Sequence, residues 1–462
     1  MSRGAARLRG SAWRALVLGL LTGALLPVAA CGPRSGRPEP RTRTVVFGID
    51  GADWDRAIPL VRSGKMPVLA RLMRTGTRRT LESLPPDAGG IERLSPTIWT
   101  SAVTGVLPER HGVLNFVAPG PDGSLQPVTS NQRRTAALWN MLTARDLDVG
   151  VVGWLVTWPA EPVKGYVVSS YTPFIFTWGP DPANRPIKGT LLPGVPHQVW
   201  PAELQAKLES LKVAPDSVTD ADVEARFLHG ALPASPGEDA MKSLEGLRWS
   251  VASDETYERA YDELVRNPPG GHRPVLDLLY FASVDVVSHR FWKYGEPGTF
   301  RFGTVDPAEI TAYGQAVESA YAYVDAALGR VLALESDAVR LIVLSDHGFR
   351  ENRLAGRPSS GWHRPQGLLV ANGPGFREGA QIRPGSVVDV APTVLYCLGL
   401  PVADDFDGSP ALDLFTPAFK ADHPVASIPS WEPETARQRE DAPIASPVDE
   451  EILGRLRSLG YL

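Results

Sequence analysis

Three aspartates stand out because each follows a short apolar stretch of the kind that forms a buried strand. They are Asp50, Asp285 and Asp346. In open α/β sheets, ligands bind outside the carboxyl ends of the strands, so we expect the three side chains to meet at one sheet edge. Three carboxylates there repel one another strongly unless a cation neutralises them. The pattern therefore predicts a metal site, although any one of these aspartates alone is equally suited to capping a helix.

Three of the eight histidines accompany these aspartates. His289 follows Asp285 by four residues, which places both side chains on one face of a helical turn. His347 directly follows Asp346, and His363 comes after a loop rich in glycine, serine and proline. A mixture of imidazoles and carboxylates suits zinc, and manganese less well. Taken alone, His363 is typical of a surface loop, but in this set it is a candidate ligand.

Several motifs occur in an order that is specific as a set, although each motif alone is weak. They are Asp50-Gly51, residues 95–105 (SPTIWTSAVTG), residues 108–112 (PERHG), the Asp285/His289 pair, residues 345–348 (SDHG) and His363. Together they resemble the type I phosphodiesterase/nucleotide pyrophosphatase branch of the alkaline phosphatase superfamily. The resemblance covers roughly residues 44–412, apart from a stretch near its middle.

The resemblance implies a site with two divalent metal ions, expected to be Zn²⁺. It implies that Thr97 is the nucleophile, at a helix N-terminus where backbone N–H groups favour an anion. The implied ligands are Asp50, Thr97, Asp346 and His347 for one ion, and Asp285, His289 and His363 for the other. Thr97 would attack phosphorus, and water would then hydrolyse a phosphothreonine intermediate. A helix-capping role for Thr97 is compatible with this one.

The segment after Thr97 bears on which ester is cleaved. Phosphomonoesterases of the superfamily resemble one another in carrying an arginine there, which suits bidentate phosphate binding. Residues 98–104 contain no arginine, so we predict hydrolysis of phosphodiesters or pyrophosphates. Asn115 is a candidate contact to a phosphate oxygen, although it equally suits a turn. The alternatives are a phosphotransferase or phosphomonoesterase of the same superfamily, or a non-catalytic surface lipoprotein that uses the fold for binding.

The order of apolar runs and helical segments predicts an α/β fold. Strands are expected at residues 44–49, 149–152, 276–282, 341–344 and 368–371, with helices between them such as residues 67–75, 135–145 and 308–334. The strands are continuously apolar rather than alternating, which favours a sheet covered on both faces. We expect a doubly wound, mostly parallel sheet sandwiched by helices, alkaline phosphatase-like in view of the resemblance, with an inserted cap region.

The chain divides into a catalytic domain and shorter flanking parts. The catalytic domain is expected at residues 44–415. Residues 171–269 are expected to form an inserted cap, because the strand–helix rhythm breaks down there, and a second small domain is the alternative. Residues 416–447 are predicted to be a proline-rich linker. Residues 448–462 carry apolar side chains at helical spacing and are predicted to be a C-terminal helix that packs back onto the body.

The N-terminal region predicts export. Residues 1–30 have the basic leader and apolar run of a secretory signal. The run ends in Val28-Ala29-Ala30-Cys31, which resembles the lipobox of bacterial lipoproteins. We therefore expect a lipid on Cys31, a tether at residues 31–43, and anchoring to a bacterial cell membrane on its periplasmic or extracellular face. The alternatives are a short uncleaved anchor helix and an ordinary secretory signal with an incidental cysteine. The net charge of −5 gives no reason to expect nucleic-acid binding.

Overall fold

The computed structural model describes most of the chain after the predicted tether. The described residues are 42–87, 90, 93–120, 123–170, 195–335, 338–353, 359–435, 443–446 and 449–462. The predicted signal, Cys31 and nearly all of the tether lie outside them. Residues 41–462 form one compact unit. In the part of the chain that is described, no helix is both long enough and apolar enough to cross a bilayer.

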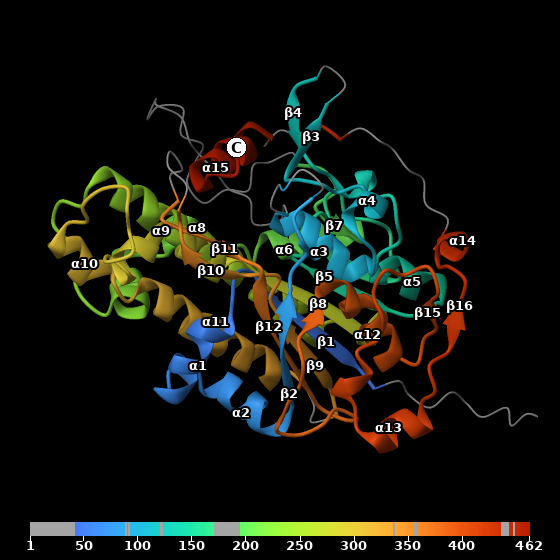
Figure 1. Ribbon diagram of the computed structural model, residues 1–462. Coiled ribbons are helices and arrows are strands. Elements are labelled where there is room, and N and C mark those ends of the chain that lie inside the picture. The colour runs from blue at the N-terminus through green and yellow to red at the C-terminus, as the bar shows by residue number, and fades with distance from the viewer. Residues whose placement is uncertain are drawn as a thin grey trace, which may run out of the picture. The chain divides into compact units, whose positions relative to one another are not determined.

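A ten-stranded sheet runs through the centre of this unit (Figure 1). Its strand order is β13-β2-β12-β9-β1-β8-β5-β6-β7, with β14 also paired to β2. The strands are β1 (Thr44–Ile49), β2 (Thr77–Glu82), β5 (Val149–Val152), β6 (Gly165–Val168), β7 (Val199–Trp200), β8 (Leu276–Phe281), β9 (Arg340–Leu344), β12 (Gln366–Asn372), β13 (Ala380–Gln381) and β14 (Gly385–Ser386).

The sheet is mostly parallel, as predicted. Strands β9, β1, β8, β5 and β6 are consecutive neighbours and all run in the same direction. Strand β12, expected from the apolar run at residues 368–371, instead pairs antiparallel to both β9 and β2. Its direction could not be read from its composition, because a strand buried on both faces is apolar whichever way it runs.

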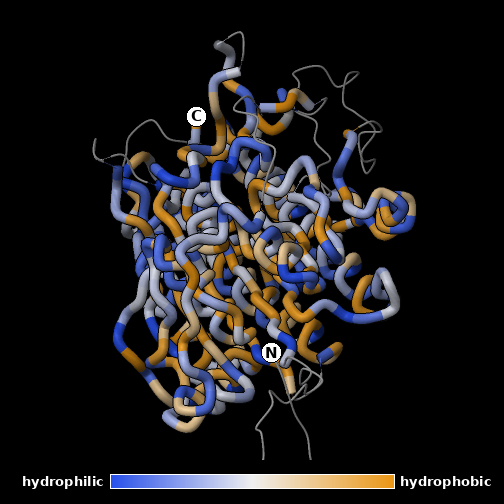
Figure 2. The backbone as a smooth tube through the Cα atoms, turned by 90° about the vertical axis from the view of Figure 1, so that its right-hand side faces the viewer, coloured by the Kyte–Doolittle hydropathy of each residue, from blue (hydrophilic) through white to orange (hydrophobic). Residues whose placement is uncertain are grey.

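Helices cover both faces of the sheet. One core cluster joins it to α1 (Trp54–Arg62), α2 (Pro67–Thr75), α8 (Glu238–Arg266), α9 (Ser283–Gly295) and α11 (Ala316–Ala333). A second cluster joins the opposite face to α3 (Ser95–Thr104), α5 (Leu138–Ala144) and α12 (Val390–Cys397). The hydrophobic stretches run along the central strands, and the outer loops are largely hydrophilic (Figure 2). This is the predicted doubly wound sandwich.

Strand β1 illustrates why the central strands have continuously apolar sequences. All six of its residues are buried. Val45 and Phe47 belong to one core cluster and Val46 to the other, because successive side chains of a strand point to opposite faces. A strand that alternated polar and apolar residues would bury polar groups against one of the two helical layers.

The predicted cap is described only from residue 195 onward, since residues 171–194 lie outside the described ranges. Strand β7 pairs antiparallel with β6 at the edge of the central sheet. Helices α6 (Gln205–Glu209) and α7 (Asp220–Val223) follow, and α8 then contacts both α9 and β8. Residues 195–269 therefore belong to the α/β body, where α8 forms part of one helical layer.

The C-terminal part of the chain is folded wherever it is described. The segment expected to be a linker contains α13 (Pro417–Asp422), β16 (Ser427–Ile428) and α14 (Glu432–Thr435). Helix α15 (Asp449–Leu459) then contacts α9 and β4 (Leu125–Pro127), the second strand of a hairpin that begins with β3 (Val117–Pro119).

Cys397 is buried at the end of α12. The long helix expected at residues 308–334 is two helices, α10 (Pro307–Tyr313) and α11.

A buried ion pair ties the start of the described chain to the central strands. Asp277 is fully enclosed in β8, with 1% of its side chain exposed. Its carboxylate accepts hydrogen bonds from Arg43 Nη2 at 2.8 Å and from Tyr166 Oη at 2.6 Å. Burial raises the pKa of Asp277, and the nearby charge of Arg43 opposes that rise. The charge of Arg43 therefore favours the ionised form of a carboxyl group that is buried inside the sheet.

We predict that Arg43→Met lowers the free energy of unfolding by about 3–5 kcal/mol, because it leaves a buried carboxylate without its cation. Urea denaturation measures the change. Lys65→Met is the matched control, since Lys65 pairs with Glu318 at an exposed position where both side chains are more than a third exposed. It should cost less than about 1 kcal/mol. Equal losses in the two variants would contradict the role given to Arg43.

Candidate active site

The three aspartates come from three adjacent parallel strands, β9, β1 and β8. Asp50 directly follows β1, Asp346 follows β9 by two residues, and Asp285 lies in the first turn of α9, after β8. The strands end almost level, with Ile49 opposite Phe281. The three side chains are between 0% and 5% exposed. The structure thus brings together at one sheet edge the carboxylates that the sequence placed at strand ends.

One group of candidate ligands contains Asp50, Asp346 and His347, whose ligand atoms lie within 4.8 Å of one another. His347 Nε2 is 3.2 Å from Asp50 Oδ1 and 3.5 Å from Asp346 Oδ2. His347 Nδ1 lies 3.1 Å from the carbonyl oxygen of Gly348, a contact in which Nδ1 donates its proton. This contact leaves the lone pair of Nε2 facing the carboxylates, as metal-binding histidines are arranged.

A second group lies beside the first and centres on Asp285. His289 Nε2 is 3.4 Å and His363 Nε2 is 3.7 Å from Asp285 Oδ1, and the two imidazole nitrogens are 3.1 Å apart. His289 Nδ1 lies 3.1 Å from the carbonyl oxygen of Gly361, which again directs Nε2 inward. His363 is carried by β11 (Gly361–Arg364), which pairs with β10 (Gly348–Glu351).

The electrostatics of these groups fit bound cations. Asp285 Oδ1 and Asp346 Oδ2 are buried and have no hydrogen-bond donor among the described residues. Burial and the charge of Asp50 raise the pKa of Asp346 well above its usual range. Burial lowers the pKa of His347, but the charges of Asp346, Asp50 and Asp285 outweigh it and raise that pKa to about 10. Carboxylates packed this closely need positive charge among them, and the imidazole and carboxylate donors suit zinc.

In the second group of candidate ligands, the pKa shifts run the other way: the pKa of the carboxyl group and that of an imidazole are both lowered. Burial would raise the pKa of Asp285, but the imidazoles of His289 and His363 lower it. Burial and the charge of His347 lower the pKa of His363 well below its usual range, so its imidazole stays neutral. A neutral imidazole next to an ionised carboxylate is the state in which both bind a metal ion.

The glycine after Asp50 is required by the close packing of the site. Gly51 has a φ of 77°, a left-handed conformation that other residues rarely adopt. A Cβ atom at this position would lie 2.7 Å from the ring of Phe349 and 3.0 Å from the Cα atom of Asp285. The chain can therefore turn out of β1 and leave Asp50 beside Asp285 only because residue 51 lacks a side chain.

Asp254 holds the start of the helix that carries Asp285 and His289. Its carboxylate accepts hydrogen bonds from the backbone N–H groups of Ala282 at 2.9 Å and Ser283 at 3.1 Å. These groups begin α9 and have no partner within the helix. Asp254 is fully buried, and burial raises its pKa to about 7. Sequence reasoning missed this residue, because its partners are 28 and 29 residues away in the chain.

One hydroxyl of α3 faces these ligands, and it belongs to Ser95. Ser95 Oγ lies 3.2 Å from His347 Nε2 and 3.4 Å from Asp50 Oδ1. Thr97 Oγ1 is fully buried and has no hydrogen-bond partner among the described residues. Both residues lie in α3, where two positions differ by about 200° around the helix axis, so they face opposite ways. Of the two hydroxyls, that of Ser95 therefore contacts the candidate ligands, whereas that of the predicted nucleophile Thr97 makes no hydrogen bond to a described residue.

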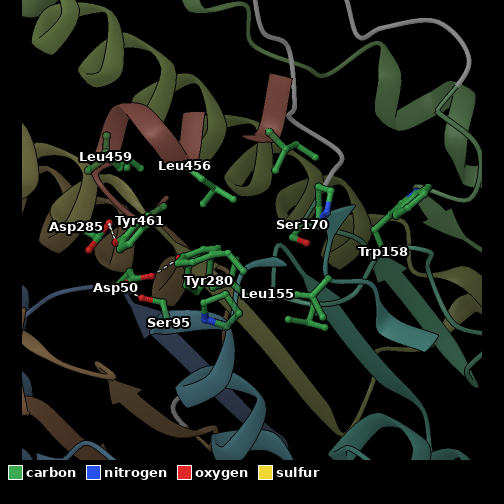
Figure 3. A pocket seen from close by; sticks show the side chains of 18 residues that line it. Asp50, Ser95, Leu155, Trp158, Ser170, Tyr280, Asp285, Leu456, Leu459 and Tyr461 are labelled. Atoms are coloured by element: carbon green, nitrogen blue, oxygen red, sulfur yellow. Dashed lines mark hydrogen bonds between the residues drawn. The ribbon is translucent and has the colours of Figure 1, made fainter. Parts of the chain in front are cut away.

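Two tyrosines that sequence reasoning did not single out complete the site (Figure 3). Tyr280, in β8, donates a hydrogen bond to Asp50 Oδ2. The hydroxyl of Tyr461, two residues after α15, lies 2.7 Å from His289 Nε2 and 3.2 Å from His363 Nε2. Because Tyr461 lies far from these histidines in the sequence, no local pattern indicated that they meet. Asn115 Oδ1 accepts a hydrogen bond from the next backbone N–H, and Asn115 is not among the described residues that line the pocket next to Ser95.

Comparison with known proteins gives a family match over most of the chain. A family model described as type I phosphodiesterase/nucleotide pyrophosphatase matches residues 44–391. A 2,3-bisphosphoglycerate-independent phosphoglycerate mutase from Dinoroseobacter shibae is 30% identical over 163 residues, which cover 33% of this chain and 31% of that protein. The match thus spans about a third of the length of that curated relative.

Solved structures of ectonucleotide pyrophosphatase/phosphodiesterase 5 are also similar to this chain. The murine protein in complex with AMP is 14% identical with a TM-score of 0.46, and the match covers 81% of this chain and 100% of that chain. The human protein is 13% identical with a TM-score of 0.44 and the same coverage of both chains.

We predict that Asp254→Ala weakens binding of added zinc by at least about tenfold, because α9 loses the group that fixes its first turn. Competition with a chromogenic chelator measures the affinity. Asp325→Ala is the matched control, since Asp325 accepts hydrogen bonds from Val68 and Leu69 N–H at the start of α2, outside the ligand groups. It should lower stability and leave zinc affinity unchanged. If both variants bind zinc like the unmodified protein, Asp254 does not position the ligands.

Proposed function

The chain belongs to the type I phosphodiesterase/nucleotide pyrophosphatase family, and we propose that it hydrolyses phosphodiesters or pyrophosphates through a covalent intermediate on Ser95. The observation that carries this proposal is the position of the Ser95 hydroxyl. Ser95 is the first residue of α3, and its hydroxyl lies within 3.5 Å of Asp50 and His347, which belong to one group of candidate ligands. A hydroxyl held against carboxylates and imidazoles that suit two metal ions is the arrangement that nucleophilic catalysis on phosphorus requires.

The proposed cofactors are two zinc ions. Asp50, Asp346 and His347 would hold one, and Asp285, His289 and His363 the other. When bound, the ions supply positive charge that lowers the pKa of the attacking hydroxyl and neutralises the leaving oxygen. Two buried carboxylate oxygens without a hydrogen-bond donor among the described residues support this assignment.

The chain's own residues carry out the remaining steps. Ser95 Oγ forms a bond to phosphorus while the bond from phosphorus to the leaving oxygen breaks. Asp50 Oδ1, at 3.4 Å from Ser95 Oγ, is positioned to accept the hydroxyl proton. A water molecule then attacks phosphorus, the bond to Ser95 Oγ breaks, and that oxygen takes up the proton that the attacking water loses. The proton held by Asp50 is released to solvent, which balances the charge of the leaving group. Tyr280 donates a hydrogen bond to the other oxygen of Asp50 and so fixes the orientation of that carboxylate.

The surroundings of Ser95 favour a diester over a monoester. A monoester carries a second negative charge, and enzymes that bind one usually supply an arginine or lysine. Among the described residues that line the pocket next to Ser95, none is arginine or lysine. A diester needs space for its second substituent instead of a further cation, and the pocket supplies that space.

We predict that Ser95→Ala lowers kcat for bis-p-nitrophenyl phosphate by at least about 10³-fold in the zinc-loaded protein, since it removes the nucleophile. Thr97→Val should change kcat by less than about threefold, because the hydroxyl it removes has no hydrogen-bond partner to lose. A chelator should abolish turnover, and added zinc should restore it.

Two outcomes decide against the proposal. If Thr97→Val is inactive and Ser95→Ala is active, the nucleophile is Thr97 and the orientation of α3 is wrong. If p-nitrophenyl phosphate is the better substrate of the unmodified protein, the enzyme is a monoesterase and the argument from the missing cation fails.

A further inference from the structure

A deep, largely apolar pocket extends away from Ser95. It has an empty volume of ≈ 780 Å³, including its opening. Asp50, Ser95, Asp285 and Tyr461 lie at one end, and Leu155 and Trp158 lie at the other (Figure 3). The pocket is therefore continuous with the proposed site of reaction.

The two ends of the pocket differ in chemistry. The carboxylates stand at the reacting end, and no described residue that lines the pocket is lysine, arginine or histidine. At the far end, the indole N–H of Trp158 donates to the carbonyl oxygen of Pro196 at 2.8 Å and is already engaged there. A second phosphate or an anionic headgroup would find no opposite charge among these residues, whereas burying a hydrocarbon chain here removes apolar surface from water, which is favourable.

The backbone at the pocket wall is held in an uncommon conformation. Val156 has a φ of 58°, in the left-handed region that β-branched residues rarely adopt. Its side chain is 7% exposed and lines the pocket. Strained residues of this kind persist where the surrounding structure fixes them, and they cluster at ligand sites.

The C-terminal helix forms the facing wall. Ile452, Leu456 and Leu459 of α15 line the pocket, and Ile452 and Leu456 pack in one cluster with Trp158. The wall is joined to the reacting end by Tyr461, whose hydroxyl lies against His289 and His363. The apolar wall is thus fixed in position relative to Ser95.

We propose that this pocket binds an alkyl chain of the substrate, so that the natural substrate is a phosphodiester with a hydrocarbon substituent. The inference rests on the proposed function, because it concerns the second substituent of the ester that Ser95 attacks. The apolar lining, the lack of cations among the described lining residues and the direct continuity with Ser95 select this occupant. Aliphatic side chains outnumber aromatic ones in the lining, which favours an alkyl chain over a flat ring.

The test compares methyl p-nitrophenyl phosphate with hexyl p-nitrophenyl phosphate on the zinc-loaded protein. Each methylene that is fully buried contributes about fourfold to binding. The hexyl ester has five more methylenes than the methyl ester, so burial of even half of this chain should raise kcat/KM by at least about 30-fold. Leu456→Trp fills the pocket from α15 and should bring this ratio close to unity. Leu125→Trp, at a residue that is 52% exposed on β4 and does not line the pocket, should keep the ratio of the unmodified protein.

Each possible result supports or overturns the proposal. Circular dichroism tests whether Leu456→Trp is folded. If that variant is unfolded, Leu155→Trp replaces it and fills the pocket from the opposite wall. A ratio near one in the unmodified protein, with both esters hydrolysed, overturns the alkyl pocket and leaves the proposed function standing. A higher kcat/KM for phenyl p-nitrophenyl phosphate than for the hexyl ester would likewise overturn the alkyl pocket and leave the proposed function standing. If neither ester is hydrolysed, the proposed function fails, and calorimetry of dihexyl against dimethyl phosphate decides the pocket: equal affinities would overturn it.

Discussion

The repulsion among three buried carboxylates is the constraint on which this structure depends. Asp50, Asp285 and Asp346 emerge from the carboxyl ends of three neighbouring parallel strands and are almost fully enclosed. Such an arrangement is stable only if positive charge is placed between them. The imidazoles that face them, the glycine that lets the chain turn at residue 51, and the helix start fixed by Asp254 all serve to hold donors around that charge.

The site divides into a charged part and an apolar part, and each is made by a different portion of the chain. The central strands and the first turns of α3 and α9 supply the ionisable groups and the Ser95 hydroxyl. The loop after β5 and the C-terminal helix supply the apolar pocket. Tyr461 connects the two, because it is carried by the apolar wall and contacts the ligand histidines. The residues proposed to carry out the reaction are thus separate from the surface that would select the substrate.

Much of the fold and of the ligand set could be predicted because both follow from local pattern. Strands buried on both faces are continuously apolar, and a polar residue at the end of such a strand meets its neighbours at the sheet edge. The direction of β12 could not be predicted, since an apolar strand suits either pairing. The contacts of Tyr461 depend on a meeting of distant segments, which a local pattern does not contain.

The choice between Ser95 and Thr97 illustrates a finer limit. Both are hydroxyl residues near the same helix start, separated only by Pro96, and either fits a nucleophile in the sequence. Their side chains differ in direction by about 200° around the helix. Which of the two faces the ligands is set by how α3 packs on the sheet through residues such as Trp99, whose ring would lie 2.9 Å from a Cβ atom at Gly48 of β1.

The central claim is that Ser95 forms a covalent bond to phosphorus. The most direct measurement is mass spectrometry of the zinc-loaded protein, quenched in acid during turnover of bis-p-nitrophenyl phosphate and digested with trypsin. Residues 94–110 form one peptide that contains both hydroxyls, so fragmentation must locate the added group. The account predicts an aryl phosphoryl group on Ser95. An adduct on Thr97, or active turnover with no adduct on this peptide, would contradict it.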